Sequence, residues 1–106
     1  MSTGPLQTPP IIIIGAARSG TNMLRDVLTR LPGFVTWPCD EIPFIWRHGN
    51  VRHPSDVLPA ESAGPDIRAY IRGKFEEFGR AHALSTVVEK TCSNSLRVPF
   101  VDRVLP

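Results

Sequence analysis

The stretch from Gly15 to Asn22 has the residue types of a loop that could bind an oxyanion. It reads Gly-Ala-Ala-Arg-Ser-Gly-Thr-Asn, with two glycines and a single cation, Arg18. A guanidinium can donate two parallel hydrogen bonds to a tetrahedral oxyanion, and it keeps its charge at any physiological pH. The stretch therefore predicts anion binding, with Arg18 as the positive charge.

The residues on either side of this loop predict the elements that position it. Ile11 to Ile14 are four β-branched residues in a row, which suits a strand buried on both faces, as in a parallel sheet. Apolar residues then recur at helical spacing until Pro32-Gly33 ends the pattern: Met23, Leu24, Val27, Leu28 and Leu31. A helix that begins at such a loop directs its free N–H groups and its dipole toward one spot, which favours an anion there.

The spacing of Gly15 and Gly20 matches the nucleotide-binding P-loop, Gly-x-x-x-x-Gly-Lys-Ser/Thr. However, Thr21 stands at the lysine position and Asn22 at the position of the magnesium-binding hydroxyl. These differences disfavour an ordinary ATPase or kinase. A sulfuryl group in transfer carries less negative charge than a phosphoryl group, so Arg18 and the amide dipoles could stabilise it without a metal.

The segment from Ala17 to Leu24 resembles the 5′-phosphosulfate-binding loop of the sulfotransferases that use 3′-phosphoadenosine 5′-phosphosulfate (PAPS). That loop usually reads Lys/Arg-Ser-Gly-Thr/Ser-Thr/Ser and then an apolar residue, and Asn22 departs from it at the last hydroxyl position. The resemblance implies that PAPS is the co-substrate and that no metal takes part. It also implies a set of donor-binding residues: Arg18, Ser19, Gly20, Thr21 and Asn22.

A second segment, Glu89-Lys90-Thr91-Cys92-Ser93-Asn94, resembles the Glu-Lys-Thr/Ser-Pro/Ala-x-Asn/Tyr segment of carbohydrate and heparan-type sulfotransferases. Val87 and Val88 precede it and predict a short strand parallel to the first, because a helical crossover separates the two. Lys90 would then lie near Arg18, at the sheet edge where open α/β proteins bind ligands. The resemblance implies that Lys90 assists the leaving oxygen and that Glu89 can be the general base. An exposed ion pair of Glu89 and Lys90 at a strand end is the alternative.

Glu41 is the other candidate base. It follows Phe34 to Trp37, which could form a short second strand. In several sulfotransferase branches a glutamate after this strand is the general base, so the resemblance implies that role for Glu41. Its position where the strand passes into a loop, on the side expected to face the acceptor, slightly favours it over Glu89. The alternative is a surface acid that caps a short helix.

The remaining pattern predicts helices that cover the sheet. An apolar stripe from Pro65 to His82 indicates a long amphipathic helix, and residues 95–105 indicate another, with Leu96 among its buried residues. We expect a disordered lead-in over residues 1–10. Over residues 11–106 we expect an α/β, three-layer, P-loop-like parallel sheet of two or three strands flanked by helices. No segment resembles the one that holds the 3′-phosphate in the family, so the resemblance implies the amino-terminal part of an incomplete sulfotransferase domain.

Composition limits the remaining possibilities. The 106 residues, 42% of them hydrophobic, suffice for one modest domain, and a net charge of +2 from scattered residues does not indicate a nucleic-acid partner. Cys39 and Cys92 lack metal-ligand spacing and are predicted to be reduced thiols. Without a secretory signal or an apolar stretch long enough to span a membrane, a cytoplasmic protein is expected.

These patterns give the hypothesis of sulfuryl transfer from PAPS to a hydroxyl, or less favourably an amine, of a carbohydrate, small molecule or peptide. Two alternatives stay open at this point. One is a truncated, inactive fragment or interaction module, and the other is a different P-loop enzyme of the kinase type. The residues do not indicate an oligomeric state.

Overall fold

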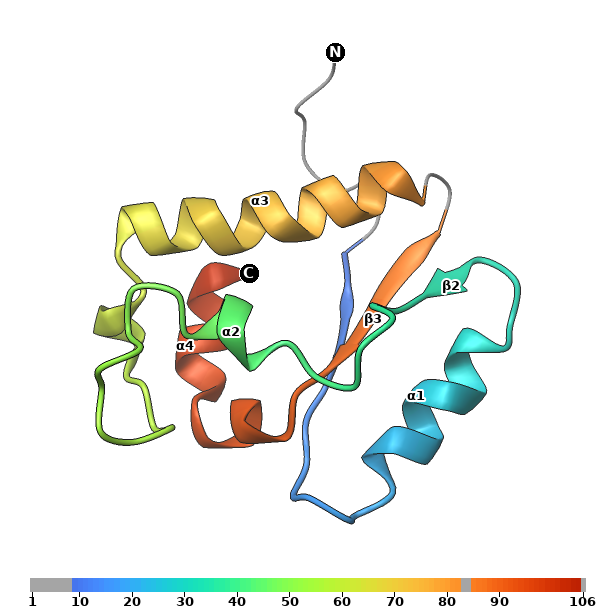
Figure 1. Ribbon diagram of the computed structural model, residues 1–106, viewed down its shortest axis with the longest axis horizontal. Coiled ribbons are helices and arrows are strands. Elements are labelled where there is room, and N and C mark those ends of the chain that lie inside the picture. The colour runs from blue at the N-terminus through green and yellow to red at the C-terminus, as the bar shows by residue number, and fades with distance from the viewer. Residues whose placement is uncertain (1–8, 83–84, 106) are drawn as a thin grey trace.

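A parallel sheet of three short strands forms the centre of the computed structural model, which describes residues 9–82 and 85–105 (Figure 1). The strands are β1 (Ile11–Ile13), β2 (Phe34–Val35) and β3 (Thr86–Lys90), in the spatial order β1-β3-β2. β3 pairs with both neighbours in parallel, with Ile13 opposite Lys90 and Phe34 opposite Thr86. The last strand in the chain is therefore the central one.

Helices cover both faces of this sheet. The α-helices are α1 (Thr21–Thr29), α2 (Pro43–Trp46), α3 (Pro65–Ala81) and α4 (Val98–Val104), and short 3₁₀ helices span Ala60–Ser62 and Cys92–Leu96. In Figure 1, α1 lies on one side of the sheet, and α2, α3 and α4 lie on the other. This is the expected α/β sheet flanked by helices.

Because side chains alternate along β3, this strand packs against other elements on both faces of the sheet. Val87 belongs to the main hydrophobic core, whose members come chiefly from α2, α3 and α4 and include Trp46, Phe75 and Phe100. Val88 is equally inaccessible to solvent but points to the opposite face, because successive side chains of a strand alternate. β3 is thus buried on both faces, and its carboxyl end lies between the two layers.

Three features differ from what the sequence patterns suggest. β1 is an edge strand that ends at Ile13 and is not buried on both faces, because Ile11 and Ile14 are exposed. The 95–105 helix is interrupted, because Arg97 has an extended φ of −148° between the 3₁₀ helix and α4, and Leu96 is exposed rather than buried. On α1, the apolar residues Met23, Leu24 and Val27 are at least half exposed, because the helix meets the sheet through the side that carries Thr21.

The predicted lead-in lies mostly outside the described residues. Of residues 1–10, the structure describes Pro9 and Pro10, which belong to no helix or strand. Both cysteines are free thiols, as predicted. Within the two described ranges, no helix combines the length and the apolar character that crossing a membrane requires.

Candidate functional site

The loop between β1 and α1 has a tightly constrained backbone. Gly20, which caps the N-terminus of α1, has a left-handed φ of 93°, and Arg18 is also left-handed, with φ 63°. Residues other than glycine rarely adopt this backbone conformation, so neighbouring contacts must hold Arg18 in it. One of them is the hydrogen bond that Ser19 Oγ donates to the carbonyl oxygen of Ala16, at 2.6 Å.

Gly15 allows this loop to pass close to the start of α1. A Cβ at this position would lie 2.8 Å from Cγ2 of Thr21, the buried residue of the helix. We expect Gly15→Ala to lower the free energy of unfolding by about 1–3 kcal/mol, the usual cost of forcing extra atoms into a packed site.

Gly73 provides the matched control for this substitution. A Cβ there would have no heavy atom within 4 Å, and the residue lies inside α3, where alanine is the better helix former. Gly73→Ala is therefore expected to raise the free energy of unfolding by about 0.5–1 kcal/mol. Urea denaturation of both variants checks the opposite signs; equal effects would show that the approach to Thr21 is unimportant.

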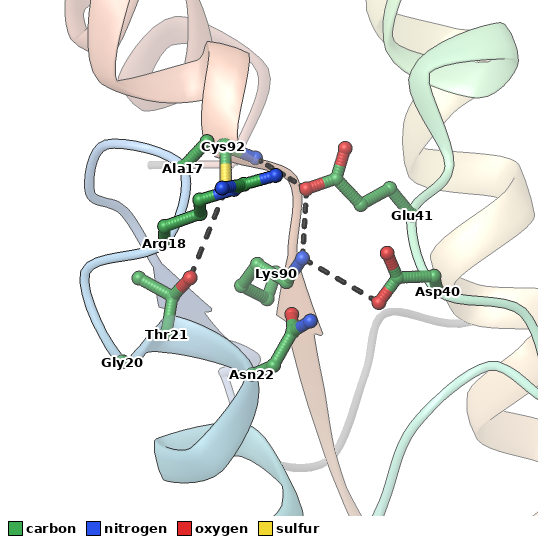
Figure 2. A pocket seen from close by; sticks show the side chains of 9 residues that line it. All are labelled: Ala17, Arg18, Gly20, Thr21, Asn22, Asp40, Glu41, Lys90 and Cys92. Carbon is green, nitrogen blue, oxygen red and sulfur yellow. Dashed lines mark hydrogen bonds and ion pairs between the residues drawn. The ribbon is translucent and has the colours of Figure 1, made fainter.

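A pocket of about 260 Å³ opens where this loop faces the carboxyl end of β3 (Figure 2). Three segments that are distant in the sequence form its walls. The loop and the start of α1 supply Ala17, Arg18, Gly20, Thr21 and Asn22, the segment after β2 supplies Asp40 and Glu41, and the end of β3 supplies Lys90 and Cys92. The structure therefore brings Arg18 and Lys90 to the same cavity.

Glu41 and Lys90 form an ion pair in the wall of the pocket. Lys90 Nζ donates to Glu41 Oε2 at 2.7 Å, and the backbone N–H of Cys92 donates to the same oxygen at 3.0 Å. Burial opposes the charged form of Glu41, but these hydrogen bonds outweigh it, so the pKa of Glu41 is lowered. The pKa of Lys90 is raised, because its hydrogen bond to Glu41 and the nearby carboxylates outweigh the opposing effect of burial.

Arg25 of α1 fixes the segment that carries this glutamate. Its Nη1 donates to the carbonyl oxygen of Asp40 at 2.7 Å and to the Asp40 carboxylate at 3.0 Å. The same carboxylate lies 3.6 Å from Lys90 Nζ. Asp40 is thus held between two cations, and its backbone is tied to α1, which sets the position of Glu41 next to it.

Glu89 lies behind the pocket rather than in its wall. Its side chain is 2% exposed and accepts hydrogen bonds from Trp46 Nε1 at 2.8 Å and from Thr91 Oγ1 at 2.6 Å. Burial raises the pKa of Glu89, and these two hydrogen bonds offset the rise only in part. Adjacent residues of a strand point to opposite faces, so Glu89 faces the core layer of α2 while Lys90 faces the pocket. The alternative of an exposed ion pair between Glu89 and Lys90 is not what the structure shows, because both residues are buried.

Thr91 connects this buried carboxylate to the segment of Glu41. While its hydroxyl donates to Glu89, its oxygen accepts the backbone N–H of Ile42 at 3.2 Å. The residue after Glu41 is therefore hydrogen-bonded to the end of β3, and Asp40, the residue before Glu41, is hydrogen-bonded to α1. Glu41 is held from both sides.

Three of the residues that shape the site were not predicted from the sequence. Asp40 and Cys92 line the pocket, and Arg25 orders its acidic wall. Cys92 Sγ lies 3.7 Å from Thr21 Oγ1, which links the end of β3 to the start of α1. By contrast, Ser19 was predicted to bind the donor but is not among the lining residues, and its hydroxyl is engaged by Ala16.

The pocket is small, and its lining combines two cations, Arg18 and Lys90, with two carboxylates, Asp40 and Glu41. Its volume lies below the range of about 300–1,000 Å³ that is typical for whole small-molecule ligands. Arg18 and Lys90 supply positive charge, and α1, whose N-terminus favours negative charge, starts at the edge of the pocket. Among the described residues, no group of three His, Cys, Asp or Glu side chains is placed to hold a metal ion.

Comparison of the chain with protein-family models, with curated proteins and with solved structures found no match.

Proposed function

We propose that the chain binds the phosphosulfate group of PAPS in this pocket and supports transfer of its sulfuryl group to an acceptor hydroxyl. In this proposal the sheet and its first loop are the P-loop-like core of a sulfotransferase. The observation that carries it is the meeting of Arg18, Lys90 and Glu41 in one cavity, at the carboxyl end of a parallel sheet and beside a helix N-terminus.

The residues of the pocket fit the demands of this donor. A bound donor supplies a sulfuryl group, whose bond to a phosphate oxygen breaks as a bond from sulfur to the acceptor oxygen forms. Arg18 and the N–H groups that begin α1 would hold the anionic group, with Thr21 and Asn22 as further donors. Lys90 would stabilise the negative charge that develops on the leaving phosphate oxygen.

Glu41 is the better placed of the two candidate bases. It lines the pocket with 28% of its side chain exposed, so an acceptor hydroxyl could reach its carboxylate and give up its proton there. Glu89 is enclosed by Trp46 and Thr91 on the other side of β3. In this proposal Glu89 acts through Thr91 to position the segment that bears Glu41.

Isothermal titration with adenosine 3′,5′-bisphosphate, the desulfated product, tests the proposal against the kinase alternative. We expect this nucleotide to bind without magnesium, and at 100 times its dissociation constant to stabilise the fold by about 2.7 kcal/mol. Arg18→Gln should weaken this binding by about tenfold or more, because a charge-assisted hydrogen bond is lost. Arg80→Gln removes an exposed cation from the end of α3 and should leave binding unchanged.

Two results would contradict the proposal. One is the absence of any heat of binding or thermal stabilisation with adenosine 3′,5′-bisphosphate. The other is stronger stabilisation by ATP with magnesium, which would favour a kinase-like enzyme. Equal losses in the Arg18 and Arg80 variants would show that the nucleotide binds by general charge rather than in the pocket.

A further inference from the structure

We propose that Lys90 and Glu41 form an anion-driven switch: an oxyanion that enters the pocket takes Lys90 away from Glu41, so a free carboxylate base exists only when the donor is bound. This inference rests on the proposed function, because it assigns a means of regulation to the same pocket. It concerns the order of events at the site and not the identity of the acceptor.

The burial of Lys90 makes the exchange conditional on an anion. Its side chain is 2% exposed, and its ammonium group lies 2.7 Å from Glu41 and 3.6 Å from Asp40. An ammonium that stays buried cannot lose its carboxylate partner without a large cost, because nothing would then offset its desolvation, but it can exchange one anionic partner for another. Because Lys90 itself lines the pocket, an oxyanion bound there becomes such a partner.

The surroundings of Glu41 allow it to be released. At 28% exposure its carboxylate can be hydrated again, and the N–H of Cys92 still donates to it at 3.0 Å. The flexible chain of Lys90 carries three donors, so it can turn toward an anion without a change in the backbone. Asp40 stays in place during this exchange, because Arg25 binds both its carboxylate and its carbonyl group.

The exchange strengthens the base. Before the exchange, Glu41 faces charged and polar groups from every element around it. The end of β3 supplies Lys90 and the Cys92 N–H, and the loop supplies Arg18. Asp40 lies on the same segment as Glu41, with Arg25 of α1 behind it, and Glu89 lies across β3. Loss of the lysine hydrogen bond and the arrival of a negative charge both raise the pKa of a carboxyl group. A carboxylate with a higher pKa accepts a hydroxyl proton more readily.

A switch and a purely structural ion pair predict different signs for substitutions of the two partners. In a switch, Glu41 competes with the anion for Lys90. Glu41→Gln should then bind sulfate about tenfold more tightly, whereas Lys90→Met should bind it about tenfold more weakly or not at all. In a structural pair, both substitutions loosen the pocket and both weaken binding.

The experiment is isothermal titration of the chain and its variants with sodium sulfate, at an ionic strength held constant with sodium chloride. The matched controls come from the exposed pair of Lys74 and Glu77 on α3, whose atoms lie 3.9 Å apart. Glu77→Gln and Lys74→Met make the same changes in net charge at a distance from the pocket. We expect both controls to bind sulfate as the unmodified chain does.

Carbon-detected NMR of the glutamate carboxyl groups gives a second measurement that needs no folded variant of the pair. Titration of the unmodified chain with acid, with and without sulfate, should show a higher Glu41 pKa when sulfate is bound. Sulfate binding with an unchanged Glu41 pKa, or weaker binding in Glu41→Gln, would overturn the switch and leave the anion site standing. If neither sulfate nor adenosine 3′,5′-bisphosphate binds the unmodified chain, the proposed function fails and the switch fails with it.

Discussion

Replacing Lys90 by methionine is expected to reduce the rate of sulfuryl transfer by about 10²–10³-fold, the effect of removing one donor that stabilises a developing oxyanion. Methionine preserves most of the buried aliphatic stem but cannot donate to the leaving phosphate oxygen. The measurement is the release of adenosine 3′,5′-bisphosphate from PAPS in the presence of carbohydrate, phenol and peptide hydroxyls.

Lys74→Met is the control for this variant, because it removes a lysine from the surface of α3. Its rate is expected to equal that of the unmodified chain. Circular dichroism and urea denaturation establish that the Lys90 variant is folded before its rate is interpreted. A folded Lys90→Met variant that keeps its rate within a factor of three would exclude a role for this lysine in transfer.

Replacing Glu41 by glutamine is expected to lower kcat by about 10²–10⁴-fold, the range for loss of a general base. Glutamine keeps the shape of the side chain but cannot take the proton of the acceptor. Binding of the donor is not expected to suffer, because Lys90 then has fewer competitors for its charge. The combination of a low kcat with tight donor binding would mark a residue that acts in the chemical step.

Glu89→Gln makes the same change on the other face of β3. We expect it to reduce kcat by less than about tenfold, through a small shift of the segment that Thr91 holds. A larger loss in Glu89→Gln than in Glu41→Gln would identify the buried glutamate as the base. Equal, mild losses in both would mean that neither glutamate accepts the proton.

The fold could be predicted from short local signals. The isoleucines that begin at Ile11, the glycines of the loop and the valines at 87–88 indicated a parallel sheet with a helical crossover, and β1 does pair with β3 in parallel. The long helix from Pro65 ends at Ala81, one residue before the predicted end of its stripe. The break at Arg97 had a signal that was not used: Pro99 lacks the N–H that a helix interior needs, and it lies in the first turn of α4, where proline is tolerated.

The candidate site was predicted in part. The shared sheet edge placed Arg18 and Lys90 together, and both line the pocket. The sequence also held a signal that was not used: Glu89 and Lys90 are adjacent in a strand, so only one of them can face the loop. In the structure it is Lys90 that faces the loop, because Lys90 and Val88 point to the side of the sheet on which α1 lies.

Other contacts of the site had no signal in the sequence. Arg25 and Asp40 meet because the segment after β2 passes beside α1, and neither spacing nor residue type indicates that pairing. The exposure of Met23 and Val27 could not be predicted either. An apolar stripe at helical spacing shows that a helix has an apolar side but not whether another element covers that side.

The central position of β3 has a consequence for how the chain acquires its shape during synthesis. Among residues 9–82 and 85–105, β1 and β2 pair only with β3, so neither has a partner in this sheet until the ribosome has released the residues up to Lys90. Such non-local pairing is slow to form, and it leaves the early segments open to proteases and chaperones for longer. The pocket, whose walls include residues from both ends of this range, is assembled in the same late step.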